Sequence, residues 1–291
     1  MNLDKMINGK SSAEHSSPEL VHHDPWDTLR QFTQARIGLG RVGTSIPTSE
    51  LLRFQLSHAQ AIDAVHVPLD EDSLVTSLAD KENLRPLLPA FHLHSEARDR
   101  VTYLQRPDLG RKLSEQGITE LKEHCDSRAK PYDLAIVIAD GLSSYAIANH
   151  AAPFLDALLN QLNADTKQAW DVAPFVIVQQ GRVAVGDDVC AAINANEVLI
   201  LVGERPGLSS PDSLGLYLTW NAYRGIEESL RNCISNVRPE GLRYDAAAHK
   251  CFYLLSESRR RHITGIGLKD RSDDHTIEHK AERQFSLVSP S

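Results

Sequence analysis

The sequence has 291 residues, enough for one large domain or two modest ones, and 41% are hydrophobic, which suffices for an ordinary packed core. Because 39 acidic residues outnumber 31 basic ones, neither nucleic acid nor an anionic membrane is an expected partner. No run approaches the ~18 apolar residues of a membrane span, and the N-terminus lacks the apolar region of a secretory signal. The four cysteines are scattered without metal-site spacing, which favours a reducing, cytoplasmic setting.

The first part of the chain reads as a polar leader followed by helices. Residues 1–22 have little apolar content, and we expect a disordered leader there. The pattern over 23–105 predicts a helical N-terminal region. Asp24 and Pro25 suit the start of one helix, and Thr48 can cap a second helix that has a broad apolar face. The first of these helices would carry an apolar stripe formed by Trp26, Leu29 and Phe32.

Strands alternate with helices over residues 106–271. Short apolar runs predict strands at 134–138, 175–178, 198–202 and 214–219. Helices are expected at 109–124, 144–150, 153–162, 187–195 and 244–258, the second of them capped by Ser143 or Ser144. This alternation predicts an α/β fold with a doubly wound, mostly parallel sheet and a helical N-terminal region beside it. The polar residues 272–291 are expected to be a tail.

Two loops are the first candidates for a functional site. Residues 179–183 follow one predicted buried strand, and residues 203–207 follow the next. Parallel sheets bind ligands at the carboxyl ends of their strands, so these loops would meet at the binding edge. The loop around Gly181 lacks the G-x-G-x-x-G spacing of dinucleotide sites, and its glycine could simply form a tight turn.

Other residues have ordinary structural explanations. A Glu-Arg pair such as Glu204 and Arg205 is usually solvated or mutually paired, and a free cysteine such as Cys233 is usually a small buried hydrophobe. The segment 139–144 lacks the second glycine of a G-x-S-x-G nucleophile motif. His92 and His94 have no evident third metal ligand. The charged residues Arg106, Asp108 and Arg111 are kept as candidate subunit contacts.

Seven segments in family order resemble the small (light) chain of ethanolamine ammonia-lyase. They are ARIGLGRVG (35–43), LLRFQLSHAQAIDAVH (51–66), RPDLGR (106–111), ADGLSS (139–144), GRV (181–183), LVGERPGL (201–208) and CISN (233–236). The resemblance extends from about residue 25 to 271, so it covers most of the chain. Each motif alone is weak evidence, and their order makes the match specific.

The resemblance implies an adenosylcobalamin enzyme that converts ethanolamine to acetaldehyde and ammonia by a radical mechanism. It places cofactor contacts on Val183, Glu204 and Cys233, and it assigns this chain no catalytic residue and no metal ligand. The partner would be a large subunit with a TIM barrel, in a hetero-oligomer that is free in the cytoplasm or inside a bacterial microcompartment. The sequence has no D-x-H-x-x-G motif, so the cofactor should keep its own base as the lower cobalt ligand, the base-on form.

Two other classes of function stay open at this point. One is a self-sufficient nucleotide-dependent α/β enzyme, which the missing fingerprint at Gly181 makes less attractive. The other is a non-catalytic assembly protein that stabilises a partner.

Overall fold

The computed structural model describes residues 21–33, 35–125 and 128–272. The chain divides into two compact units, Met1–His58 and Ala59–Ser291, and helix α1 (Thr48–His66) passes from the first into the second. Most of the expected leader (1–22) and almost all of the expected tail (272–291) lie outside the described residues, although Val21 and His22 form the short strand β1.

The first unit is built from short elements. β1 (Val21–His22) pairs antiparallel with β2 (Arg41–Val42). Between them lies a 3-10 helix, η1 (Pro25–Gln31), in which Asp24 is the N-cap and accepts a hydrogen bond from the backbone of Trp26, as predicted. Arg30 of η1 forms an ion pair with Glu50 of α1 at 2.8 Å. Several large apolar side chains of this unit stay exposed, with Trp26 at 65% and Phe32 at 81%.

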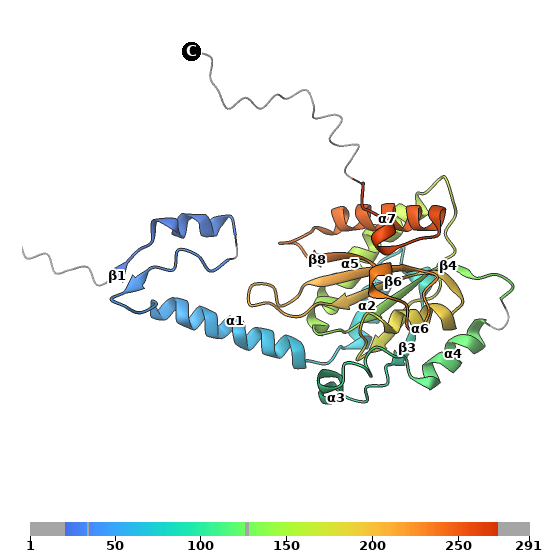
Figure 1. The fold of residues 1–291 in the computed structure, drawn as a ribbon, viewed down its shortest axis with the longest axis horizontal. Coiled ribbons are helices and arrows are strands. Elements are labelled where there is room, and N and C mark those ends of the chain that lie inside the picture. Colours follow the sequence, from blue (N-terminus) through green and yellow to red (C-terminus); the bar gives the residue numbers. More distant parts are fainter. Residues whose placement is uncertain (1–20, 34, 126–127, 273–291) are drawn as a thin grey trace, which may run out of the picture. The chain divides into compact units, whose positions relative to one another are not determined.

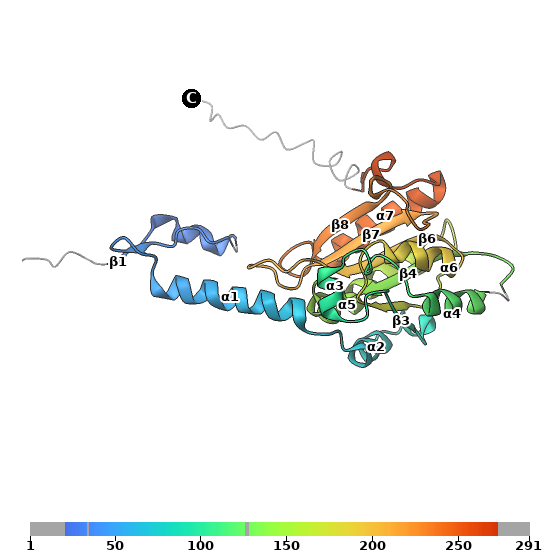
Figure 2. The same cartoon turned by 60° about the horizontal axis from the view of Figure 1, so that its bottom comes forward.

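The second unit contains a six-stranded sheet in the order β3-β5-β4-β6-β7-β8. Figures 1 and 2 show this sheet from two directions. Its strands are β3 (Phe91–His94), β4 (Tyr132–Ala139), β5 (Val176–Gln179), β6 (Ala195–Gly203), β7 (Leu214–Trp220) and β8 (Asn232–Val237). The first four in the sheet order are parallel, and β7 and β8 continue it as antiparallel neighbours. The predicted α/β fold with a mostly parallel sheet is therefore confirmed.

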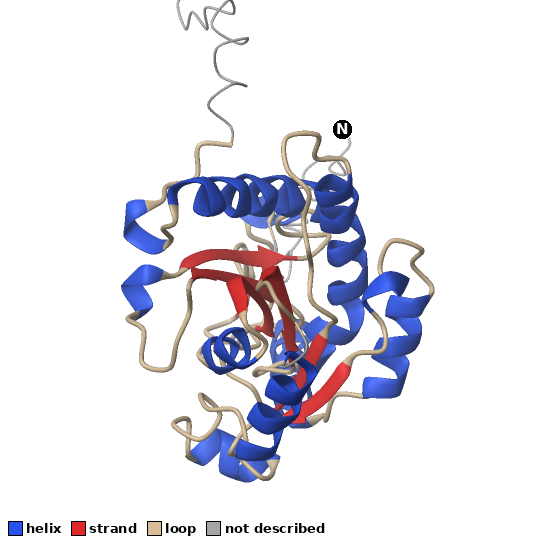
Figure 3. Cartoon of the chain, turned by 90° about the vertical axis from the view of Figure 1, so that its right-hand side faces the viewer, coloured by secondary structure: helices blue, strands red, loops and turns tan. Residues whose placement is uncertain are grey.

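Helices cover both faces of the sheet, as Figure 3 shows. One face is packed against α5 (Ser144–Asn163) and α7 (Tyr244–Arg261), and α2 (Glu71–Ala79) packs on α5. The other face is packed against α6 (Val185–Ala192) and α4 (Glu115–Cys125). Alternate residues of β4 enter the two cores, and this burial on both sides explains its unbroken apolar run. The remaining elements are α3 (Arg100–Gln105) and the 3-10 turns η2 (Arg85–Leu87), η3 (Glu228–Leu230) and η4 (Gly265–Gly267).

Some element boundaries differ from the prediction. The two helices expected at 144–150 and 153–162 are one helix, α5, that continues through Pro153. Proline removes one helical hydrogen bond, but α5 buries apolar side chains on both sides of it, from Ile147 to Leu162, and this packing holds the helix together. Residues 91–94, placed by the sequence in the helical N-terminal region, form the edge strand β3 of the sheet.

The chain topology creates a crevice at the carboxyl ends of the parallel strands. The connection after β4 leads to α5 on one face, whereas the connection after the neighbouring β5 leads to α6 on the other. Adjacent loops that leave in opposite directions open a ligand site between them. Among the helices of the described residues, none is long and apolar enough to cross a membrane.

Candidate functional site

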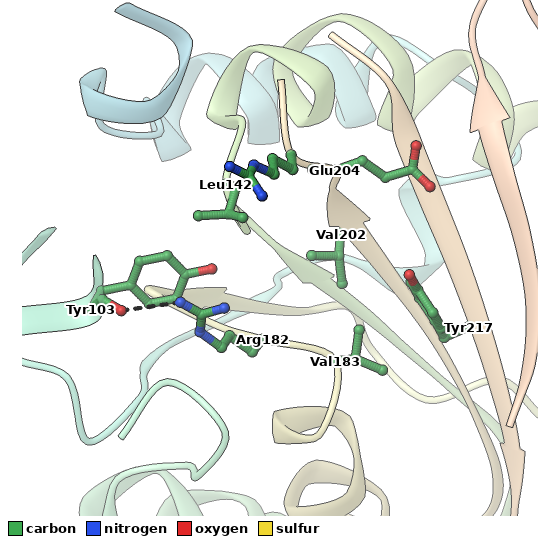
Figure 4. A pocket seen from close by; sticks show the side chains of 9 residues that line it. Tyr103, Leu142, Arg182, Val183, Val202, Glu204 and Tyr217 are labelled. Carbon is green, nitrogen blue, oxygen red and sulfur yellow. Dashed lines mark hydrogen bonds between the residues drawn. The ribbon is translucent and has the colours of Figure 1, made fainter. Parts of the chain in front are cut away.

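A pocket of about 420 Å³ lies at this carboxyl edge. It is formed by the loops after β4, β5 and β6, together with α3 and β7, and is lined by Tyr103, Leu142, Arg182, Val183, Val202, Gly203, Glu204, Arg205 and Tyr217. Figure 4 shows Tyr103 and Arg182 on one side, Glu204 and Tyr217 on the other, and the aliphatic side chains of Val183 and Val202 between them. The pocket thus has an aliphatic centre and a polar group at each end.

The structure brings two of the three predicted site residues into this pocket. Val183 and Glu204, which are 21 positions apart in the sequence, line the same pocket. Cys233 does not line the pocket. It lies on β8 directly opposite Tyr217 of β7, and Tyr217 does line the pocket. Paired residues of neighbouring strands point to the same face of a sheet, so Cys233 borders the pocket through Tyr217. Cys233 is exposed, which argues against its explanation as a small buried hydrophobe.

The carboxylate of Glu204 is held by β8 and by the residue directly before β7. Its Oε2 accepts a close hydrogen bond from the hydroxyl of Ser213 and another from the backbone N–H of Asn236 at 3.3 Å. No ion pair joins Glu204 to Arg205 in the described part of the chain, so the explanation as a mutually paired couple is wrong. Held in this way, the carboxylate can accept a further hydrogen bond from a ligand.

Tyr103 forms the opposite wall, and its ring contacts two guanidinium groups. The guanidinium carbon of Arg100 lies 4.8 Å from the ring centroid, and that of Arg182 lies 4.6 Å away. The phenol donates to the carbonyl of Gly181 at 3.3 Å. Burial raises the pKa of Tyr103 to about 12, and the nearby Asp140 carboxylate adds to the rise. The ring therefore stays neutral near physiological pH and supports the two cations through its face.

Asp140 fixes the loops beneath this wall. Its carboxylate is buried, accepts from the backbone N–H of Gly181 at 3.1 Å and lies 3.4 Å from Arg100. Burial raises the pKa of Asp140 to about 6, and Arg100 opposes the rise. Ser143 caps α5, as predicted, because its side chain accepts from the N–H of Ala146. The segment 139–144 is thus a structural junction, and the serine is a helix cap.

Sequence reasoning missed Tyr103 and Tyr217, and it included Arg182 only as part of the candidate loop 179–183, without assigning it a contact. Arg182 directly precedes a predicted contact, and its position in the same loop was an available signal. Tyr103 comes from a segment about eighty positions earlier, and only the fold brings it to the loop. The G-x-G-x-x-G spacing does occur at Gly38, Gly40 and Gly43, but these residues flank the two-residue strand β2 of the first unit. They do not follow a strand of the parallel sheet, so they lack the context of a dinucleotide site.

The other candidates lie in ordinary surface contacts. Arg106 pairs with Asp108 at 2.7 Å, and Arg111 forms a close pair with Glu228. His92 forms a close contact with Glu71. All these side chains except that of Glu71 are substantially exposed, and such pairs contribute little to stability.

Comparisons with known proteins identify the relatives of this chain. A family model described as ethanolamine ammonia-lyase light chain matches residues 23–269. The ethanolamine ammonia-lyase small subunit of Pseudomonas fluorescens (strain Pf0-1) is 50% identical over 264 residues, which is 91% of this chain and 93% of the relative. The small subunit from Pseudomonas paraeruginosa (strain PA7) is 49% identical over 93% of this chain and 96% of the relative. The small subunit from Pseudomonas putida (strain F1) is also 49% identical, over 92% of this chain and 94% of the relative.

Proposed function

The chain belongs to the ethanolamine ammonia-lyase light chain family, and we propose that it holds adenosylcobalamin against the large subunit of an ethanolamine ammonia-lyase. The observation that carries the proposal is the placement of Val183 and Glu204 in one pocket at the carboxyl edge of the sheet. The enzyme is a lyase, and this chain is its small subunit.

The chemistry of the lining fits this cofactor. A corrin ring has largely aliphatic faces and carries amide side arms around its rim. Val183 and Val202 offer an aliphatic surface to such a ring, and Glu204 can accept a hydrogen bond from an amide N–H at the rim. Exposed Cys233, beside Tyr217, would extend the contact by packing.

The size of the pocket supports a shared site. Pockets of about 300–1,000 Å³ enclose drug-sized ligands, and cobalamin is much larger than the 420 Å³ available here. This chain would therefore cover one part of the cofactor, and the large subunit, for which we propose a TIM barrel, would cover the rest and bind ethanolamine.

Bound adenosylcobalamin supplies the radical chemistry by which ethanolamine becomes acetaldehyde and ammonia. The residues of this chain bind and orient the cofactor, and the proposal assigns them no proton or hydrogen transfer. We further propose that this chain would supply no cobalt ligand, since its sequence has no D-x-H-x-x-G motif, and that the cofactor would bind in its base-on form. The hetero-oligomer would work in the cytoplasm, free or within a bacterial microcompartment.

Reconstitution tests the proposal against its two alternatives. Ethanolamine deamination is measured with adenosylcobalamin and this chain alone, the large subunit alone, and an equimolar mixture. We expect activity only in the mixture. Steady deamination by this chain alone would instead indicate a self-sufficient enzyme, and full activity of the large subunit alone would reduce this chain to an assembly protein.

A further inference from the structure

We propose that Arg182 binds an anion at the pocket, and that this anion is the phosphodiester of the cofactor's nucleotide loop. The inference rests on the proposed cobalamin site and assigns a ligand group to a residue that the family resemblance did not single out. Its basis is a guanidinium group that is firmly positioned but has no counter-charge among the residues that the structure describes.

Three contacts fix the position of Arg182. Its backbone N–H donates to the carbonyl of Gly110 at 2.8 Å, and its Nη2 donates to the carbonyl of Tyr103 at 3.2 Å. The guanidinium also stacks on the Tyr103 ring at 4.6 Å. Because Tyr103 is itself buried and also contacts Arg100, the guanidinium is held against a rigid wall. Little side-chain entropy is then left to lose on binding.

The contacts that hold Arg182 leave its charge uncompensated. No carboxylate of the described residues lies within ion-pair distance of it, and its partners are a carbonyl and a neutral phenol ring. Its Nε is buried and has no hydrogen-bond partner within the described chain. A buried donor without a partner is costly, so the surroundings of this side chain do not satisfy it fully. A ligand in the pocket, which Arg182 lines, could accept from the other guanidinium nitrogens and compensate the charge.

The balance of charge across the pocket favours an anion. Arg205, which also lines the pocket, forms no ion pair within the described residues either. Glu204 is the one carboxylate of the lining, and its Oε2 already accepts from Ser213 and Asn236. Two guanidinium groups that form no ion pair within the described residues, against one carboxylate, leave the lining with an excess of positive charge. Guanidinium forks match phosphate oxygens well.

The chemistry of the cofactor identifies which group would be bound. The peripheral arms of cobalamin are neutral amides, and its nucleotide loop carries a single anionic phosphodiester. Arg182 lies at the end of the pocket opposite Glu204 (Figure 4). A ligand that spans the valine surface would thus meet Glu204, which can accept a hydrogen bond from an amide N–H, at one end. At the other end it would meet Arg182, which can bind an anion.

Titration of the assembled two-subunit enzyme with two corrinoids tests this inference. Hydroxocobalamin contains the phosphodiester, whereas cobinamide lacks the nucleotide loop, and the absorbance change of each gives its dissociation constant. We expect Arg182→Gln to weaken hydroxocobalamin binding by roughly ten- to a hundredfold and to change cobinamide binding less than about twofold, within the error of such comparisons. Arg182→Lys, which keeps the charge without the fork, should give an intermediate loss for hydroxocobalamin alone.

The control is Arg260→Gln on α7, which removes an exposed arginine paired with Glu257 and should change neither constant. Equal weakening of both corrinoids, or no weakening of either, would overturn the assignment. Loss of co-elution with the large subunit for Arg182→Gln without any corrinoid would indicate a carboxylate of that subunit as the partner, and would also overturn it. If the wild-type complex binds neither corrinoid, the proposed function itself fails, which is a different result from failure of the Arg182 assignment.

Discussion

At the scale of single residues, Glu204 is the predicted contact whose environment is best defined. We expect Glu204→Gln to weaken cobalamin binding to the two-subunit enzyme by roughly ten- to a hundredfold, because a charge-assisted hydrogen bond is lost. Turnover at saturating cofactor should change less. The glutamine keeps an acceptor for Ser213 and Asn236, so the loop should stay folded. Absorbance titration gives the constant.

Glu123→Gln on α4 is the matched control, because this glutamate is exposed and does not line the pocket. An unchanged dissociation constant for Glu204→Gln, in a complex that assembles normally, would remove Glu204 from the site.

A second glutamate predicts a pH dependence of stability. Glu197 of β6 is fully buried, and neither carboxylate oxygen has a hydrogen-bond partner within the described chain. Burial raises its pKa to about 8 from an ordinary 4.5. The folded chain then holds this proton more tightly than the unfolded chain, so the wild type loses stability as the pH rises from about 4.5 to 8, at up to about 1.4 kcal/mol per pH unit.

Glu197→Gln removes this titration. Its melting temperature relative to the wild type should rise steadily between pH 5 and pH 8 and level off above pH 8. Thermal unfolding of both proteins over this range checks the prediction, and parallel pH profiles would contradict it.

Whether a site residue could be predicted depends on how much of the fold is needed to bring it to the pocket. The loops that contain Val183 and Glu204 could be predicted because each follows an apolar run that reads as a buried strand, and such strand ends meet in a parallel sheet. The choice of these two residues within the loops came from the family resemblance. Tyr103 could not be predicted, because its role depends on α3 lying over a loop that comes much later in the chain. The hydrogen bonds of Glu204 with Ser213 and Asn236 could not be predicted from the sequence either, because they depend on the register of β7 and β8.

At the scale of elements, the loops after β4 and β6 are fastened together by close backbone approach at Gly203. The N–H of Leu142 donates to the carbonyl of Gly203 at 2.9 Å, and the Ser143 hydroxyl donates to the carbonyl of Pro211 at 2.8 Å. A Cβ on Gly203 would lie 2.0 Å from the carbonyl oxygen of Ser143, which leaves no room for any side chain. This contact sets the position of Glu204, the next residue.

We therefore expect Gly203→Ala to lower the free energy of unfolding by about 1–3 kcal/mol or more and to weaken cobalamin binding as Glu204 is displaced. Gly267→Ala is the matched control, because its Cβ would meet only the Cδ1 of Ile263 at 3.4 Å. Urea unfolding of both variants gives the two free energies of unfolding to be compared. Equal stability of the two variants would show that the loops have more freedom than the structure indicates.

Elements were predictable where burial is continuous and less so elsewhere. The runs that became β4, β5, β6 and β7 are apolar because both faces of the sheet are covered. β3 and β8 lie at the two edges of the sheet, where the apolar signal weakens; their assignment depends on pairing with neighbours. Pro153 suggested a helix break, but the packing of α5 outweighed the local cost.

At the scale of the whole molecule, the family match covers residues 23–269 and leaves out both polar ends. Removal of residues 1–20 and 273–291 should preserve assembly, cofactor affinity and specific activity, because neither segment contains a matched motif or the apolar content to join a core. Solubility is to be measured separately from specific activity. Loss of specific activity in a soluble, assembled double truncation would show that one end contributes to the site.

A longer deletion that reaches Phe32 should behave differently. It removes η1 together with Trp26 and Phe32, whose exposed side chains are suited to burial against another surface, and it breaks the pair of Arg30 with Glu50. We expect a lower yield of the two-subunit complex on gel filtration. An unchanged yield would mean that these apolar side chains make no contact that assembly needs.

The central claim is that this chain supplies part of the cobalamin surface of a two-subunit enzyme. Its most direct test is the dissociation constant of hydroxocobalamin, by absorbance titration, for this chain alone, the large subunit alone and the purified complex. The account predicts tight binding by the complex and binding at least tenfold weaker by either chain alone. A large subunit that binds cobalamin by itself as tightly as the complex does would contradict it.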